Sequence, residues 1–119
     1  MATLTDMARE LGQSIARTDE YQALRRALSS ADDDRELTEL RNAMERLETD
    51  ISAAVRAGQE PSDEMKTEYE STFARLQVNP GYQRVAVAQS NFDKILLKVN
   101  QTISEGMESA AESKIILPS

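Results

Sequence analysis

Two long stretches of this chain repeat apolar residues at steps of three and four, and this spacing constrains the fold more than any other feature. The first stretch carries Leu37, Leu40, Met44, Leu47, Ile51 and Ala54, and the second carries Val85, Ala88, Phe92, Ile95, Val99 and Ile103. Such spacing puts one apolar stripe on each of two helices, and each stripe needs a partner that buries it. The pattern therefore predicts an all-α protein.

Capping signals divide the first half of the chain into three helices. The first begins after Thr3 or Thr5, and Thr18 is a good N-cap for the second. A polar break over residues 29–34 ends the second helix. Asp33, with a glutamate three residues later, resembles a capping box that opens the third helix. This helix runs to residue 57, and Gly58 is a natural residue to end it.

The second half contains two more helices. Ser62 caps the fourth, and Asn79 followed by Pro80 opens the fifth, which extends to about Ser113 with Gly106 as a point where it can bend or fray. Short connections force neighbouring helices to reverse direction. We therefore predict a single domain over residues 1–119, built as a five-helix antiparallel bundle with two long helices, at 34–57 and 80–110, packed against each other.

The residue types that are missing remove most tools of catalysis and metal binding. The chain has no cysteine and no histidine, which excludes thiolate zinc sites, iron–sulfur ligation, Ser/His/Asp triads and His-containing di-iron sites. Asp32, Asp33, Asp34 and Glu36 together suggest a divalent-cation site, but a solvated loop with a helix cap is the preferred interpretation because the spacing is not that of a calcium loop. We predict no enzyme activity, no catalytic residue, no cofactor and no metal.

Charge and hydropathy indicate the class of partner. The net charge of −7 repels polyanions and disfavours direct nucleic-acid binding, although Arg17, Arg25 and Arg26 lie close enough in sequence to leave a local basic patch open. No run of apolar residues approaches the length of a membrane span, and the first residues lack the pattern of a signal peptide. We therefore expect a cytoplasmic protein that binds neither membranes nor nucleic acid.

A lean core predicts that apolar surface is shared with a second subunit. Leu, Ile, Val and Phe make up only about a fifth of the chain. We expect a homodimer or a larger assembly in which the long helices contribute to the interface. The candidate interface residues are Leu47, Tyr82, Phe92, Ile115, Ile116 and Leu117. The alternative for Tyr82 and for the C-terminal tail is that they complete the core, or that the tail is a frayed terminus.

Several short segments match a known family in order and spacing. They are residues 8–12 (ARELG), 18–24 (TDEYQAL), 57–62 (AGQEPS), 79–80 (NP), 91–96 (NFDKIL) and 99–103 (VNQTI). In these segments and in the long helix between them, residues 4–107 resemble the YlbF/YmcA-like family of small helical bacterial proteins, and within it the YheA-like branch.

The resemblance implies an all-helical antiparallel fold that assembles into dimers or larger oligomers in the bacterial cytosol, without enzyme activity. Some members act in complexes that influence RNA processing, competence, sporulation and biofilm formation. Their association with iron–sulfur clusters through cysteines is not carried over, because this chain has no cysteine. We expect a non-enzymatic oligomeric protein-interaction module with a regulatory role. The alternative is an adaptor that binds another protein of an RNA-processing (ribonuclease) complex.

Overall fold

The structure, a computed structural model, describes the backbone of residues 1–116 and the side chains of residues 1–111. Within this part the chain forms five helices and no strand. They are α1 (Leu4–Ala16), α2 (Asp19–Asp32), α3 (Arg35–Arg56), α4 (Asp63–Gln77) and α5 (Pro80–Ile116). The predicted all-α fold of five helices is confirmed, and α3 and α5, with 22 and 37 residues, are the two longest as predicted.

The predicted helix caps explain where most helices begin and end. The side chains of Thr18 and Ser62 accept hydrogen bonds from the third backbone N–H of α2 and α4. Gly58 follows α3 with a φ of 75°, a conformation that glycine adopts without steric cost. Helix α5 continues through Gly106 to Ile116, three residues beyond the expected end.

The boundary between α2 and α3 differs from the prediction. Helix α2 continues through Asp32, and the N-cap of α3 is Asp34, not Asp33. Asp33 still has helical backbone angles, whereas Asp34 is extended and its Oδ1 accepts a hydrogen bond from the Leu37 N–H at 3.0 Å. Three successive aspartates offer three equivalent caps to sequence reasoning, and only the backbone angles select one of them.

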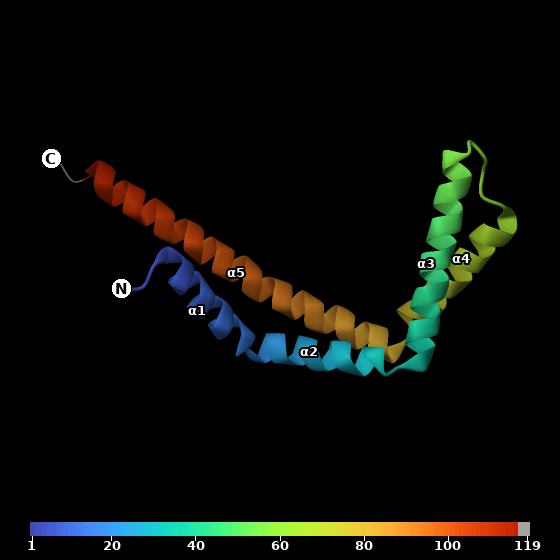
Figure 1. The fold of residues 1–119 in the computed structure, drawn as a ribbon, viewed down its shortest axis with the longest axis horizontal. Helices are drawn as coiled ribbons and strands as arrows, with labels where there is room; N and C mark the ends of the chain where they lie inside the picture. The colour runs from blue at the N-terminus through green and yellow to red at the C-terminus, as the bar shows by residue number, and fades with distance from the viewer. Residues whose placement is uncertain (117–119) are drawn as a thin grey trace.

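The five helices form two arms that meet at an elbow (Figure 1). In one arm α5 runs antiparallel along α2 and then continues past α1, and in the other α4 doubles back along α3. The prediction that the two longest helices pack against each other is therefore wrong. Each packs against a shorter helix, because the turn after α3 returns the chain along α3 itself, and α5 then leaves the elbow in another direction.

The tightest packing lies at the elbow. The buried cluster there consists of Ala31, Leu37, Leu40, Met44 and Leu76, with Tyr69, Tyr82 and Val85 packed against it. Leu37 is 0% exposed. The first turn of α5 approaches α3 so closely that a Cβ on Gly81 would lie 3.1 Å from the Asp34 Oδ2. Asn79 is buried, and its Oδ1 accepts a hydrogen bond from the Tyr82 N–H at 3.0 Å, which fixes the start of α5.

Outside the elbow the molecule is thin. Its radius of gyration is 22.2 Å, against about 13.5 Å for a compact domain of this length. Its accessible surface is 9314 Å², about 2,900 Å² more than the surface of a compact monomer of the same mass. Most apolar side chains of the two arms therefore face only one neighbouring helix.

Candidate interaction surface

Helix α1 presents an apolar face that the described part of the chain leaves uncovered. A capping box between Thr3 and Asp6 fixes the start of this helix. None of its residues is buried, and Leu4, Met7 and Leu11 are 81%, 52% and 37% exposed. An amphipathic helix in water gains most of its stability by burying this face. The apolar face of α1 is therefore a surface that the described residues, 1–111, leave without a partner.

Helix α5 has the same property over residues 101–111, all of which are exposed. Ile103 and Met107 are 45% and 64% exposed. They continue a row of apolar residues that begins with Ile95, two turns before Ile103, and Val99, one turn before it. Helix α2 has only 14 residues, so this part of α5 extends beyond α2 and does not pack against it.

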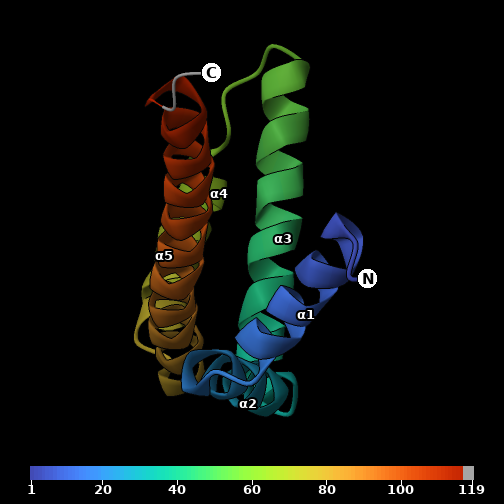
Figure 2. The ribbon, with the colours of Figure 1, turned by 90° about the vertical axis from the view of Figure 1, so that its left-hand side faces the viewer.

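A groove connects these two faces. Figure 2 shows α1 tilting away from α5, so that the two helices diverge. The groove between them has a volume of about 310 Å³ and a mostly apolar lining. It is lined by Leu11, Ile95, Lys98, Val99, Thr102 and Ile103. We call the exposed faces of α1 and of residues 95–107 of α5, with this groove, the α1–α5 surface.

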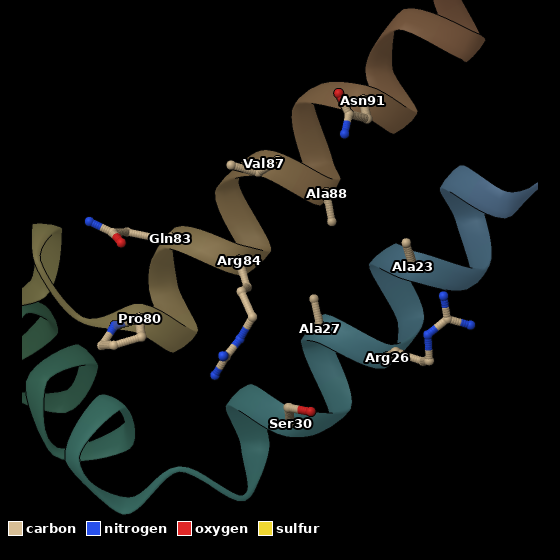
Figure 3. A pocket seen from close by; sticks show the side chains of 10 residues that line it. All are labelled: Ala23, Arg26, Ala27, Ser30, Pro80, Gln83, Arg84, Val87, Ala88 and Asn91. Carbon is tan, nitrogen blue, oxygen red and sulfur yellow. The ribbon is translucent and has the colours of Figure 1, made fainter.

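A second groove lies between α2 and α5 near the elbow, with a volume of about 590 Å³ (Figure 3). Small side chains form its floor, and Ala27 of α2 faces Ala88 of α5 across it. Arg84 extends from α5 toward α2, and Arg26 lines the groove from α2. We call this site the α2–α5 groove. Of the three arginines singled out in the sequence, it is Arg26 that lines it.

The residues predicted for an interface lie in different environments. Leu47 is 3% exposed and buried within its own chain. Tyr82 is half-buried against the elbow cluster, and Phe92 is half-buried with its ring 5.4 Å from that of Tyr21. The side chains of Ile115 and Ile116, and Leu117 as a whole, lie outside the described residues. The structure brings none of the described three together, and their role in an interface stays a prediction.

Sequence reasoning did not single out the exposed apolar face of α1 as an interaction surface. The spacing of Leu4, Met7 and Leu11 marks an apolar side of α1, but the spacing does not tell whether another helix of the chain covers it. The structure supplies that information, because α1 diverges from α5 and contacts chiefly α2.

Two searches of the described residues concern metal-binding clusters and membrane-spanning helices. Among the described side chains, those of residues 1–111, no cluster of three or more carboxylates could hold a metal ion. In the acidic segment before α3, Asp34 serves as a helix cap, in agreement with the preferred interpretation of that segment. No helix in this part of the chain combines the length and the apolar character needed to cross a bilayer.

Residues 4–108 match the family model Com_YlbF, described as "Control of competence regulator ComK, YlbF/YmcA". The chain belongs to this family. The match covers both arms and the elbow, and therefore includes the α1–α5 surface and the α2–α5 groove.

Relatives of similar length include UPF0342 proteins of Streptococcus mutans and Lactobacillus acidophilus. A UPF0342 protein of Streptococcus mutans is 28% identical over 107 residues, which are 90% of this chain and 95% of the relative. A UPF0342 protein of Lactobacillus acidophilus is 25% identical over 94% of this chain and 97% of its own. A crystal structure titled as Bacillus subtilis RicA in complex with RicF is similar in fold, with a TM-score of 0.81, 16% identity and coverage of 91% of this chain and 96% of that chain.

Proposed function

We propose that this protein is a non-enzymatic protein-interaction module that works as a homodimer or larger assembly. The observation that carries the proposal is the apolar face of α1, uncovered among the described residues, together with the exposed residues 101–111 of α5. Isolated helices with one apolar side are marginal in water, so a partner that covers this side stabilises both helices.

The size of the exposed surface supports this proposal. The chain exposes about 2,900 Å² more than a compact monomer of its mass, and a standard protein interface buries about 1,600 Å² in total. Membership in the YlbF/YmcA family supports a regulatory role through protein contacts, because the family is described by control of a competence regulator. A complex between two proteins, RicA and RicF, is the setting in which the similar fold was solved.

Sedimentation velocity over nanomolar to micromolar concentrations tests self-association. We expect the mass to rise from one subunit toward at least two, and the helical signal of the chain to rise with it, because α1 gains its partner on association. A wild-type chain that stays monomeric at high micromolar concentration contradicts the proposal of self-association.

A second candidate function is that of an adaptor within an RNA-processing complex. The α2–α5 groove favours it, because the Arg84 side chain and the lining residue Arg26 beside an apolar floor suit an acidic amphipathic segment of another protein. Capture from the native cytosol tests this function. A single stoichiometric ribonuclease partner, lost in an Arg26→Glu, Arg84→Glu variant but retained by a Lys66→Glu control, supports it. Direct RNA binding that survives physiological salt contradicts an adaptor that acts through protein contacts alone.

A further inference from the structure

The two edges of the α2–α5 groove carry exposed polar side chains at seven-residue steps. They are Asp19, Arg26 and Asp33 on the edge formed by α2, and Arg84, Asn91 and Lys98 on the edge formed by α5. Seven residues make nearly two helical turns, so each set stays on one side of its helix and advances about 10.5 Å per step. Arg26, Arg84 and Asn91 line the groove itself, and Lys98 lines the groove that follows it between α1 and α5.

Antiparallel packing of α2 and α5 puts these side chains at three levels along the groove. Ala27 of α2 faces Ala88 of α5, and the levels follow by counting residues outward from this pair. The pairs that share a level, to within about two residues, are Asp33 with Arg84, Arg26 with Asn91, and Asp19 with Lys98. From the elbow outward, the α2 edge therefore carries negative, positive and negative charge. The α5 edge carries positive, neutral and positive charge.

None of these charges is neutralised inside the described part of the chain. Among the described residues, no ion pair includes any of the five charged side chains of the two edges. The opposite charges at the two outer levels are held apart across the groove. Between them lie the small side chains of the floor and Val87, which is 61% exposed. A helix seated on this floor would bury its apolar side and bring one flank to each charged edge.

We propose that the α2–α5 groove binds a helix of another protein whose charges are complementary to these two edges. The flank that faces α2 carries a basic, an acidic and a basic residue at seven-residue steps. The flank that faces α5 carries a carboxylate at each outer level. Such a helix needs about 15 residues, because the outer levels lie about 21 Å apart. The inference rests on the protein-interaction function proposed above and specifies the partner.

The order of charges selects a protein helix over a nucleic acid. The phosphates of RNA are uniformly negative, so along the α2 edge they would meet Asp19 and Asp33 as well as Arg26. The net charge of −7 adds a general repulsion. A helix of mixed charge satisfies both edges at once. Charges at seven-residue steps beside an apolar seam are also the feature by which packed helices select partner and orientation.

Two synthetic helical peptides test the charge order. The matched peptide has alanine and leucine on the side that meets the floor, and glutamate and lysine at the five charged positions described above. The reversed peptide exchanges every glutamate and lysine. By fluorescence anisotropy at about 0.15 M salt, we expect the matched peptide to bind at least tenfold more tightly. It carries one more glutamate than lysine, so unspecific attraction to this acidic protein would favour the reversed peptide instead.

Neighbouring arginines of α2 provide a matched pair of variants. Arg26→Glu puts a negative charge at the middle level, and we expect it to weaken binding of the matched peptide about fivefold or more. A matched peptide with lysine in place of its central glutamate should recover the affinity to within about twofold. Arg25→Glu makes the same change in net charge, but Arg25 does not line the groove and lies about 100° further round α2. This control should leave the affinity unchanged.

Filling the groove gives a second, independent readout. Ala23 lines the groove and is half-buried, so Ala23→Leu occupies space that the apolar side of the peptide needs. We expect the affinity for the matched peptide to fall about tenfold. Ala86→Leu adds the same side chain to an exposed part of α5 that does not line the groove, and should leave the affinity unchanged. Thermal unfolding checks that both variants remain folded.

Each adverse result has a definite meaning. Equal binding of the two peptides, no measurable binding of the matched peptide, or equal losses from Arg26→Glu and Arg25→Glu would overturn the charge order. An oligouridylate that binds at the same salt and is lost in Arg26→Glu would overturn it too, and would assign the groove to nucleic acid. Sedimentation measures self-association separately, so the interaction module proposed above survives these results. A monomeric wild type that still selects the matched peptide contradicts self-association and leaves the present inference intact.

Discussion

The two arms of the molecule begin from the same kind of sequence pattern and end in different states. In the α3–α4 arm the stripe of Leu40, Met44 and Leu47 is buried, because α4 returns along it. In the other arm the row from Ile95 to Met107 becomes progressively more exposed toward the C-terminus. The comparison teaches that an amphipathic stripe predicts a covered face, but does not tell whether the cover comes from the same chain.

The lengths of the helices explain the difference. Helix α3 has 22 residues and α4 has 15, so the hairpin covers most of the α3 stripe. Helix α5 has 37 residues, whereas its antiparallel neighbour α2 has 14, and α1 diverges instead of continuing along α5. The buried cluster at the elbow includes residues from both arms, and the contrast between the arms grows with distance from it.

The largest effect is expected where both arms meet. Leu37→Ala removes a side chain that is 0% exposed and packed in the elbow cluster, and we expect it to lower the free energy of unfolding by about 2–5 kcal/mol. Leu97→Ala on α5, in the arm that α5 forms with α2 and α1, is the matched control. It should change the free energy of unfolding by less than about 0.5 kcal/mol. Urea denaturation of both variants at one protein concentration measures the difference. Similar losses of stability at the two sites would mean that α5 around Leu97 is as well packed as the elbow.

Alanine substitutions at two glycines should change the stability by smaller amounts and in opposite directions. Gly81→Ala places a methyl group 3.1 Å from the Asp34 Oδ2 and 3.2 Å from the Asn79 Oδ1, the side chains that cap α3 and α5. We expect a net loss of about 1 kcal/mol, because displaced caps outweigh the gain in helix propensity. Gly12→Ala meets nothing within 4 Å on the open α1, and should stabilise the helix by about 0.5–1 kcal/mol. Thermal unfolding checks the signs, and a stabilising Gly81→Ala would show that the elbow has room to adjust.

Local signals in the sequence predicted the helices well. Thr18, Ser62 and Gly58 mark boundaries through hydrogen bonds and backbone angles within one turn, so the sequence contains what is needed to place them. Equivalent neighbours, such as Asp33 and Asp34, leave an error of one residue. The five helices and the two longest among them follow from these signals.

The pairing of helices and the exposed surface could not be predicted in the same way. Both depend on the direction in which the chain leaves the elbow, and this direction is set by contacts between distant residues such as Gly81 and Leu37. The same apolar spacing therefore marked Leu47, which lies in the core, and Leu11, which lies at an open groove. Burial in three dimensions separates the two, and periodicity alone does not.

The smallest effect is expected from the ion pairs that join α3 and α4. Arg46 and Glu68 lie 3.9 Å apart, and their side chains are 67% and 57% exposed, so solvent screens the attraction. A double-mutant cycle of Arg46→Ala and Glu68→Ala should give a coupling of about 0.5 kcal/mol or less. So small a coupling would mean that the α3–α4 arm is held together by its apolar stripe. A coupling above about 1 kcal/mol would instead assign its closure in part to charge, and the contrast between the arms would no longer rest on apolar burial alone.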